Sequence, residues 1–139
     1  MVTILGVDPG ETTGYALVIC GETMDTLDIV EHGVVVLWHG LEDLIVQYKV
    51  NIVVAEQFRL YPKLAKVQSF STMVASRVLG AVEEITDRLE IPLKEQGANI
   101  GKNVHVPDSI YNIVRKYKSA HEKDALKHAI AYLYGIGVK

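Results

Sequence analysis

The N-terminal segment Ile4-Leu5-Gly6-Val7-Asp8-Pro9-Gly10 continues as Glu11-Thr12-Thr13-Gly14-Tyr15-Ala16-Leu17-Val18, and the rest of the predicted fold is organised around it. An apolar run ends in the carboxylate of Asp8, turns at Pro9-Gly10 and returns as a second apolar run from Gly14, which is typical of a β-hairpin. The first run is apolar enough for a strand in the middle of a sheet. Asp8 either caps the turn, as Asp often does before Pro-Gly, or is a rigidly held ligand or base.

The composition fits one domain spanning residues 1–139. With 49% hydrophobic and 22% charged residues, the chain can build a core and stay in solution. No apolar run is long enough to cross a bilayer, and the N-terminus lacks the basic leader and cleavage site of a signal peptide. Cys20, the only cysteine, is expected to be a buried thiol. We therefore expect a cytoplasmic protein with no membrane partner.

The charges are unevenly distributed along the chain. The net charge of -3 argues mildly against a nucleic-acid binder. However, residues 57–82 contain no Asp or Glu, and residues 94–118 are also rich in Lys and Arg. These segments are either solvated surface or one basic face that binds phosphates. The candidate DNA-binding cations are Arg59, Lys63, Lys66, Arg77, Lys94 and Lys102.

Hydrophobic periodicity predicts an α/β fold with a five-stranded mixed sheet flanked by helices. The expected strands are residues 2–8, 14–20, 26–36, 50–55 and a short strand that opens at Ile91-Pro92-Leu93. The expected helices are residues 40–49, 67–89, 107–117 and 119–134, with loops at 57–63 and 96–103. The first three strands form an antiparallel meander, and the first helix is a crossover that makes the fourth strand parallel to the first or its neighbour. In the last helix, Ser119 and Glu122 predict a capping box, and Gly135 predicts the end.

Two carboxylates are expected at one edge of this sheet. Asp8 ends the first strand, and Glu56 directly follows the fourth. Because the carboxyl ends of parallel strands point to the same edge, the two side chains would meet there. A structural role for Glu56 is the alternative, but the coincidence of two such strand ends favours a functional one.

The last helix supplies further groups. His121 and Asp124 are three residues apart and share one helix face. A lone Asp in a first turn usually lies at the surface, where the helix dipole favours it, but the two strand-end carboxylates favour a ligand role for Asp124. Three carboxylates with one imidazole suit Mg²⁺ or Mn²⁺, and such sets most often perform two-metal phosphoryl transfer. His121 is a ligand or a general base, and His128 either supports the site or belongs to the core.

In order and spacing, three motifs resemble the RuvC family of Holliday junction resolvases: Ile4 to Gly10 with Thr13-Gly14-Tyr15, then Val53-Val54-Ala55-Glu56-Gln57-Phe58, then His121-x-x-Asp124-Ala125. The resemblance covers nearly the whole chain and is greatest to compact, phage-encoded members. It implies an RNase H-like fold and a homodimeric crossover junction endodeoxyribonuclease, which hydrolyses four-way and other branched DNA with two Mg²⁺ or Mn²⁺ ions per site. A phage-encoded member would act in the cytoplasm of the host cell.

The resemblance also implies roles for single residues. Asp8, Glu56, His121 and Asp124 would be the metal ligands and the catalytic residues, and Phe58 would lie near the centre of the junction. Two copies would pair through the helix at residues 67–89. Its small residues, with the adaptable Met73, are suited to close contact with a partner or with the parent sheet: Ser69, Ser71, Thr72, Ala75, Ser76 and Gly80.

Three other classes of protein share parts of this pattern. Phosphate-loop proteins of the actin and hexokinase group also open with an Asp-x-Gly hairpin, but they need a second nucleotide-binding domain, for which 139 residues leave no room. We therefore expect no nucleotide cofactor. A YqgF-type nuclease acting on RNA usually carries a Gly-rich second half of the first motif and a later Arg-containing motif, and neither is found here. A non-catalytic module that binds branched DNA would not need all of the site residues intact.

Overall fold

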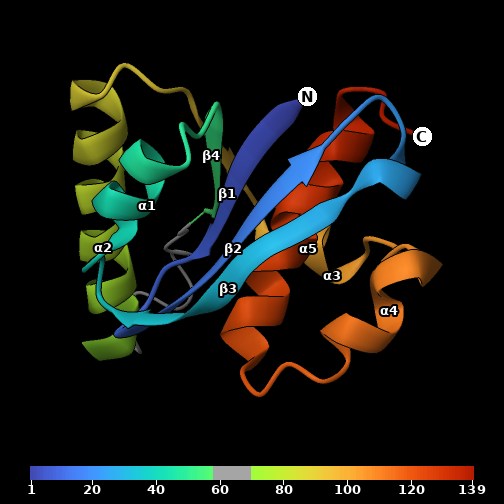
Figure 1. Ribbon diagram of the computed structural model, residues 1–139. Coiled ribbons are helices and arrows are strands. Elements are labelled where there is room, and N and C mark those ends of the chain that lie inside the picture. Colours follow the sequence, from blue (N-terminus) through green and yellow to red (C-terminus); the bar gives the residue numbers. More distant parts are fainter. Residues whose placement is uncertain (58–69) are drawn as a thin grey trace.

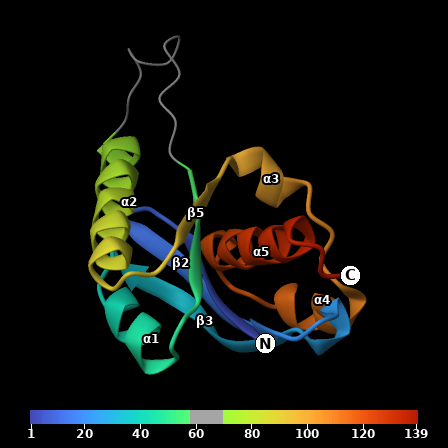
Figure 2. The ribbon, with the colours of Figure 1, turned by 90° about the horizontal axis from the view of Figure 1, so that it is seen from above.

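The fold is a five-stranded mixed sheet with helices on both faces (Figures 1 and 2). The computed structural model describes residues 1–57 and 70–139. The strands are β1 (Val2–Asp8), β2 (Thr12–Cys20), β3 (Asp28–Val36), β4 (Ile52–Glu56) and β5 (Leu93–Gln96). The α-helices are α1 (Leu41–Gln47), α2 (Phe70–Arg88), α3 (Ala98–Lys102), α4 (Asp108–Val114) and α5 (Ala120–Gly135), and a short 3₁₀ helix spans Met24–Thr26.

The sheet has the strand order β3-β2-β1-β4-β5, with β1 in the middle. Strand β1 pairs antiparallel with β2, which pairs antiparallel with β3. On its other side, β1 pairs parallel with β4, which pairs parallel with β5. This is the predicted fold class, with three antiparallel strands followed by parallel ones, and the crossover through α1 makes β4 parallel to β1 as expected.

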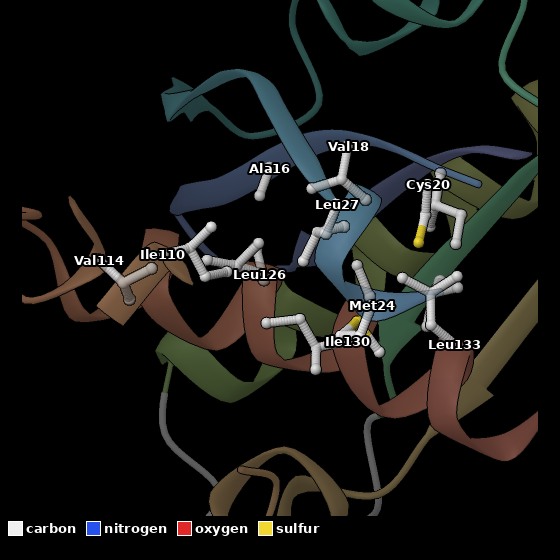
Figure 3. Close-up of a cluster of buried hydrophobic side chains, with 14 of the residues drawn as sticks. Ala16, Val18, Cys20, Met24, Leu27, Ile110, Val114, Leu126, Ile130 and Leu133 are labelled. Carbon is white, nitrogen blue, oxygen red and sulfur yellow. The ribbon is translucent and has the colours of Figure 1, made fainter. Parts of the chain in front are cut away.

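Alternate residues of the central strands enter two separate cores. In β1, Leu5 and Val7 face the core under α1 and α2, whereas Ile4 faces the core under α5. Figure 2 shows α2 and α1 on one side of the strands and α5 on the other. Figure 3 shows the second core, in which side chains of β2, the 3₁₀ turn, α4 and α5 meet. Cys20 is buried there as a free thiol, as expected.

Two glycines allow α5 to lie directly on the sheet. A Cβ atom at Gly6 would come within 2.1 Å of the backbone oxygen of Ala125, and one at Gly14 within 2.2 Å of the carbonyl of His121. Any other residue would force the helix away from the strands, because real Cβ atoms do not approach so closely. The backbone of α5 is therefore held at the sheet surface near the carboxyl end of β1.

The structure corrects three predicted element boundaries. Residues 96–103, predicted as a loop from their Gly and Asn content, contain the helix α3. The helix predicted over 107–117 ends at Val114, and the following turn buries Tyr117. The last helix continues through Gly135, and Gly137, with a φ of 97°, adopts the left-handed conformation that follows its end.

Other boundaries agree closely with the prediction. The capping box of Ser119 and Glu122 is present at the start of α5. The long helix is described from Phe70 to Arg88, and its predicted first residues, 67–69, lie outside the described residues. Among the helices of residues 1–57 and 70–139, none combines the length and the apolar character needed to span a membrane.

Candidate active site

One row of residues crosses the sheet beneath α5. The strand register pairs Asp8 of β1 with Gly14 of β2, and Glu56 of β4 with Gln96 of β5. The β1–β4 pairing places Val7 beside Ala55, so Asp8 and Glu56 are neighbours at the next position. Side chains alternate along a strand, so Asp8 and Glu56 face the same side as Ile4 and Ile52, toward α5.

Asp8 is the central residue of this row. It is only 5% exposed, and its Oδ2 lies 2.9 Å from Nδ1 of His121, in the first turn of α5. A hydrogen bond also joins the side chains of Asp8 and Glu56, and the charge of Asp124 acts on Asp8. The structure therefore places His121 and Glu56 against Asp8, with Asp124 near enough for its charge to act on Asp8. Their roles as metal ligands and catalytic residues stay a prediction.

The two strand-end carboxyls have opposite electrostatic environments. Burial raises the pKa of Asp8 far above its usual value, and the hydrogen bond and negative charge of Glu56 raise it further. The pKa of Glu56 is lowered, chiefly by His128 and also by its hydrogen bond to Asp8 and the positive charge of Lys102. Because the groups titrate as a pair, one proton resides on the pair, on the side of Asp8, and Glu56 carries the negative charge.

His128 supports Glu56 from within the core. Its side chain is 1% exposed, and its Nε2 lies 3.6 Å from Oε1 of Glu56. Nε2 of Gln96 lies 2.9 Å from the backbone oxygen of His128 and 3.2 Å from its Nδ1. The contact with a carbonyl oxygen identifies that Gln96 atom as the amide nitrogen, so it donates to Nδ1 and the ring proton is on Nε2, toward Glu56. His128 is therefore both a core residue and a support of the site.

The donor set fits a hard divalent cation. Carboxylate oxygens and an imidazole nitrogen are ligands for Mg²⁺ or Mn²⁺, and a bound cation would favour the charged form of Asp8, which burial and the neighbouring carboxylates now disfavour. Within residues 1–57 and 70–139, no group of three or more His, Cys, Asp or Glu side chains is arranged so that it could hold a metal ion. These residues are therefore candidate ligands, and metal binding by them stays a prediction.

The predicted DNA-binding residues are only partly described. Phe58, Arg59, Lys63 and Lys66 lie outside the described residues. Arg77, Lys94 and Lys102 are exposed, on α2, β5 and α3 respectively. Of these three, Lys102 acts on the site, since its charge lowers the pKa of Glu56. Their contacts with DNA stay a prediction.

A second cluster, beside His121, fixes the start of α5, and only part of it was predictable from local sequence. Glu122 is buried, and its Oε2 accepts a hydrogen bond from the backbone N–H of Ser119. Its Oε1 lies 2.7 Å from Nδ1 of His32 on β3, whose ring stacks on Tyr117 at 3.9 Å between centroids. The capping motif predicted the first bond, but the contact with His32 depends on a strand 90 residues earlier.

The same fold occurs in solved structures of junction-resolving enzymes. RuvC of Thermus thermophilus in complex with a Holliday junction substrate has a TM-score of 0.74 and 17% identity, with 99% of this chain and 97% of that chain covered. The Holliday junction resolvase of fowlpox virus has a TM-score of 0.62 and 13% identity, with coverages of 97% and 99%. The mitochondrial Holliday junction resolvase of yeast has a TM-score of 0.52 and 13% identity, with coverages of 94% and 76%.

These comparisons establish the class of fold. No family model and no curated protein sequence matches the chain. The structural likeness extends over nearly the full chain at low sequence identity, so the chain has a RuvC-like RNase H fold, as the motifs predicted.

Proposed function

We propose that the protein is a metal-dependent endonuclease that resolves Holliday junctions and related branched DNA. The observation that carries this proposal is the contact of His121 and Glu56 with the buried carboxyl of Asp8, on which the charge of Asp124 also acts. Solved structures with the same fold, including RuvC with its junction substrate, support the choice of DNA. We also propose that the protein acts in the cytoplasm, that of a host cell if it is phage-encoded.

Asp8, Glu56 and Asp124, with or without His121, would hold the divalent cations. Bound cations of this kind supply Lewis-acid chemistry, in which a water becomes nucleophilic and charge on the leaving 3′ oxygen is stabilised. The strand β1 and the glycine-mediated contact with α5 fix Asp8 and His121 rigidly, which preserves the geometry of the reacting groups. Because Nδ1 of His121 is bonded to Asp8, Nε2 is the nitrogen available to a cation or to a proton from water.

Two copies of the chain would be needed for resolution. A four-way junction has near two-fold symmetry, and its resolution requires two symmetric cuts, whereas the part of one chain that the structure describes holds one such site. A homodimer with a two-fold axis supplies two sites in the right relation. The exposed face of α2 is suited to the contact, since Met73 is 54% exposed and the position of Gly80 has open space around it.

The proposal is tested by incubating the protein with labelled four-way junction, sequence-matched duplex and single-stranded RNA, each with Mg²⁺, Mn²⁺ or EDTA. We expect paired nicks at symmetric positions in the junction, with Mg²⁺ or Mn²⁺ only. The Asp8→Asn variant should bind the junction and leave it intact. Cleavage of the RNA in preference to the junction would favour the RNA-directed alternative, and junction binding without any cleavage would favour a non-catalytic module.

A further inference from the structure

A basic hollow lies outside the candidate active site, between α4, the segment before it and α5. Its volume is about 450 Å³. The polar and aromatic residues that line it are His105, Asp108, Tyr111, Arg115, Lys123 and Lys127. Of the lining residues that the structure describes, Arg115, Lys123 and Lys127 are basic, and Asp108 is the one carboxylate. The hollow is therefore positive in a chain whose net charge is -3.

The cations of the hollow are not neutralised by the protein. Within residues 1–57 and 70–139, the ion pairs involve Arg88, His32, His121 and His128, and none involves Arg115, Lys123 or Lys127. Lys123 and Lys127 are nevertheless half-buried. Unpaired cations held in a concave surface concentrate positive potential and attract an anion.

The helix α5 connects this hollow to the candidate active site. At about 100° per residue, Lys123 and Lys127 lie about 60–100° from Asp124 on one side of the helix, whereas His121 and His128 lie about 40–60° from it on the other. Along the axis, the two lysines are only about 1.5 and 4.5 Å from Asp124. An anion in the hollow would therefore lie one helix width or less from Asp124.

We propose that the basic hollow binds backbone phosphates of the DNA strand that leaves the active site, within a few nucleotides of the cut. This inference rests on the proposed function, because a strand cut beside Asp124 must continue over one of the surfaces next to it. Lys123 and Lys127 supply charge at neighbouring positions of one helix face, and Arg115 adds a planar donor that suits phosphate. Tyr111, which is 56% exposed, provides an aromatic wall against which a sugar or base can pack.

The test compares two double variants with the same change in charge. Lys123→Gln/Lys127→Gln removes charge from the hollow. Lys49→Gln/Lys139→Gln removes it from exposed positions outside the hollow, before β4 and at the C-terminus. Binding of the four-way junction is measured in EDTA from about 50 to about 200 mM salt. We expect the hollow variant to bind about tenfold more weakly and its salt slope to fall by about 2, since each phosphate contact contributes about 0.9.

The control variant should bind within about twofold of the wild type, and both variants should unfold at the wild-type temperature. Equal losses in the two variants would overturn the proposal, because they would reflect net charge alone. Binding of polyglutamate, as a model of an acidic protein segment, is measured on the same variants. Loss of polyglutamate binding in the hollow variant with unchanged junction binding would also overturn the proposal, because it would assign the hollow to an acidic protein segment. Failure of the wild type to bind or cut the junction would instead contradict the proposed function, so the two failures are distinguishable.

A cross-linking measurement locates the contact on the DNA. Because Cys20 is buried, a photoreactive thiol reagent will label an introduced Lys127→Cys in preference to it. We expect cross-links to the junction strand within a few nucleotides of the cleavage position. The same reagent on Lys139→Cys should give no cross-links near the cleavage position. Cross-links from position 127 that are spread evenly along the junction arms would contradict the proposed path.

Discussion

His128 Nε2 lies 3.6 Å from Glu56 Oε1 inside the core, and its ring is oriented from the other side by Gln96. The distance is longer than a normal hydrogen bond, yet the N–H directed at the carboxylate favours its ionised form and keeps Glu56 charged next to the protonated Asp8. A buried histidine that fixes the charge and orientation of a candidate ligand acts through that ligand. Its effect should therefore appear in the chemical step rather than in DNA binding.

The first prediction concerns this donor. We expect His128→Leu to lower the rate of junction cleavage about 10- to 100-fold, the usual effect of losing such a supporting contact, and to raise the Mn²⁺ concentration needed for half-maximal binding in calorimetry. Junction affinity in EDTA should change less than twofold. His128→Gln places an amide nitrogen at a similar reach, so it should restore much of the loss. Equal defects in the two variants would assign the effect to ring packing, since both remove the ring.

The second prediction concerns the charge of Asp8 in the absence of metal. A buried carboxyl with a raised pKa binds a proton in the folded state that it releases in the unfolded state. The free energy of unfolding therefore falls as the pH rises from the usual Asp value near 4 toward the raised pKa. We expect Asp8→Asn to remove this fall and to stabilise the metal-free protein at neutral pH by about 1–3 kcal/mol, measured by urea unfolding in EDTA.

The same variant should lose the response to metal. Mg²⁺ or Mn²⁺ should raise the unfolding temperature of the wild type, because a ligand that binds only the folded state stabilises it, and should leave that of Asp8→Asn nearly unchanged. Asp28→Asn, an exposed change on β3, is the matched control and should respond like the wild type. If the difference in unfolding free energy between wild type and Asp8→Asn stays constant between about pH 4 and 7 in EDTA, the inferred protonation of Asp8 is contradicted.

The third prediction tests how α5 is held on the sheet. In Gly14→Ala, the new methyl group would meet the His121 carbonyl at 2.2 Å, so we expect a loss of about 1–3 kcal/mol in unfolding free energy. The displaced His121 and Asp124 should lower cleavage by about a hundredfold, the typical cost of a misplacement near 1 Å. The control is Gly135→Ala at the end of the same helix, where a Cβ meets nothing within 4 Å. It should be neutral or slightly stabilising, and equal losses in both would contradict the close approach.

Most of the fold follows from local sequence patterns, and the exceptions depend on contacts between distant segments. The hairpin of β1 and β2 is encoded by two apolar runs around Pro9-Gly10, and the start of α5 by its capping box, so both were predictable. Helix α3 was predicted as a loop because its Gly and Asn residues disfavour helix. Its backbone at Gly101 lies where a Cβ would be 3.0 Å from the ring of His128, a contact that its local composition does not reveal.

The candidate site divides in the same way. Asp8 and Glu56 could be predicted because each ends an apolar strand, and His121 with Asp124 because their spacing marks one helix face. Gln96 could not, since its position beside Glu56 depends on the register of β4 and β5, and its partner His128 is 32 residues away. Single polar residues at the end of a short strand carry no periodic signal, so only the assembled sheet shows their role.

The last prediction concerns pairing through α2. Ser76 is exposed on the face of α2 that also carries Met73 and Gly80, and a Cβ at Gly80 would meet nothing within 4 Å. This face is therefore not packed on the parent sheet, which leaves it free for a second copy.

We expect light scattering at micromolar concentration to give about twice the chain mass of 15.4 kDa. Ser76→Trp should reduce the mass to that of one chain and convert paired cuts into single nicks, with an unchanged unfolding profile at low concentration. Asn112→Trp, an equally bulky change on the exposed surface of α4, should leave mass and paired cutting intact. A wild type that is monomeric both free and on the junction would contradict pairing, because one chain with one site cannot make two symmetric cuts in a single binding event.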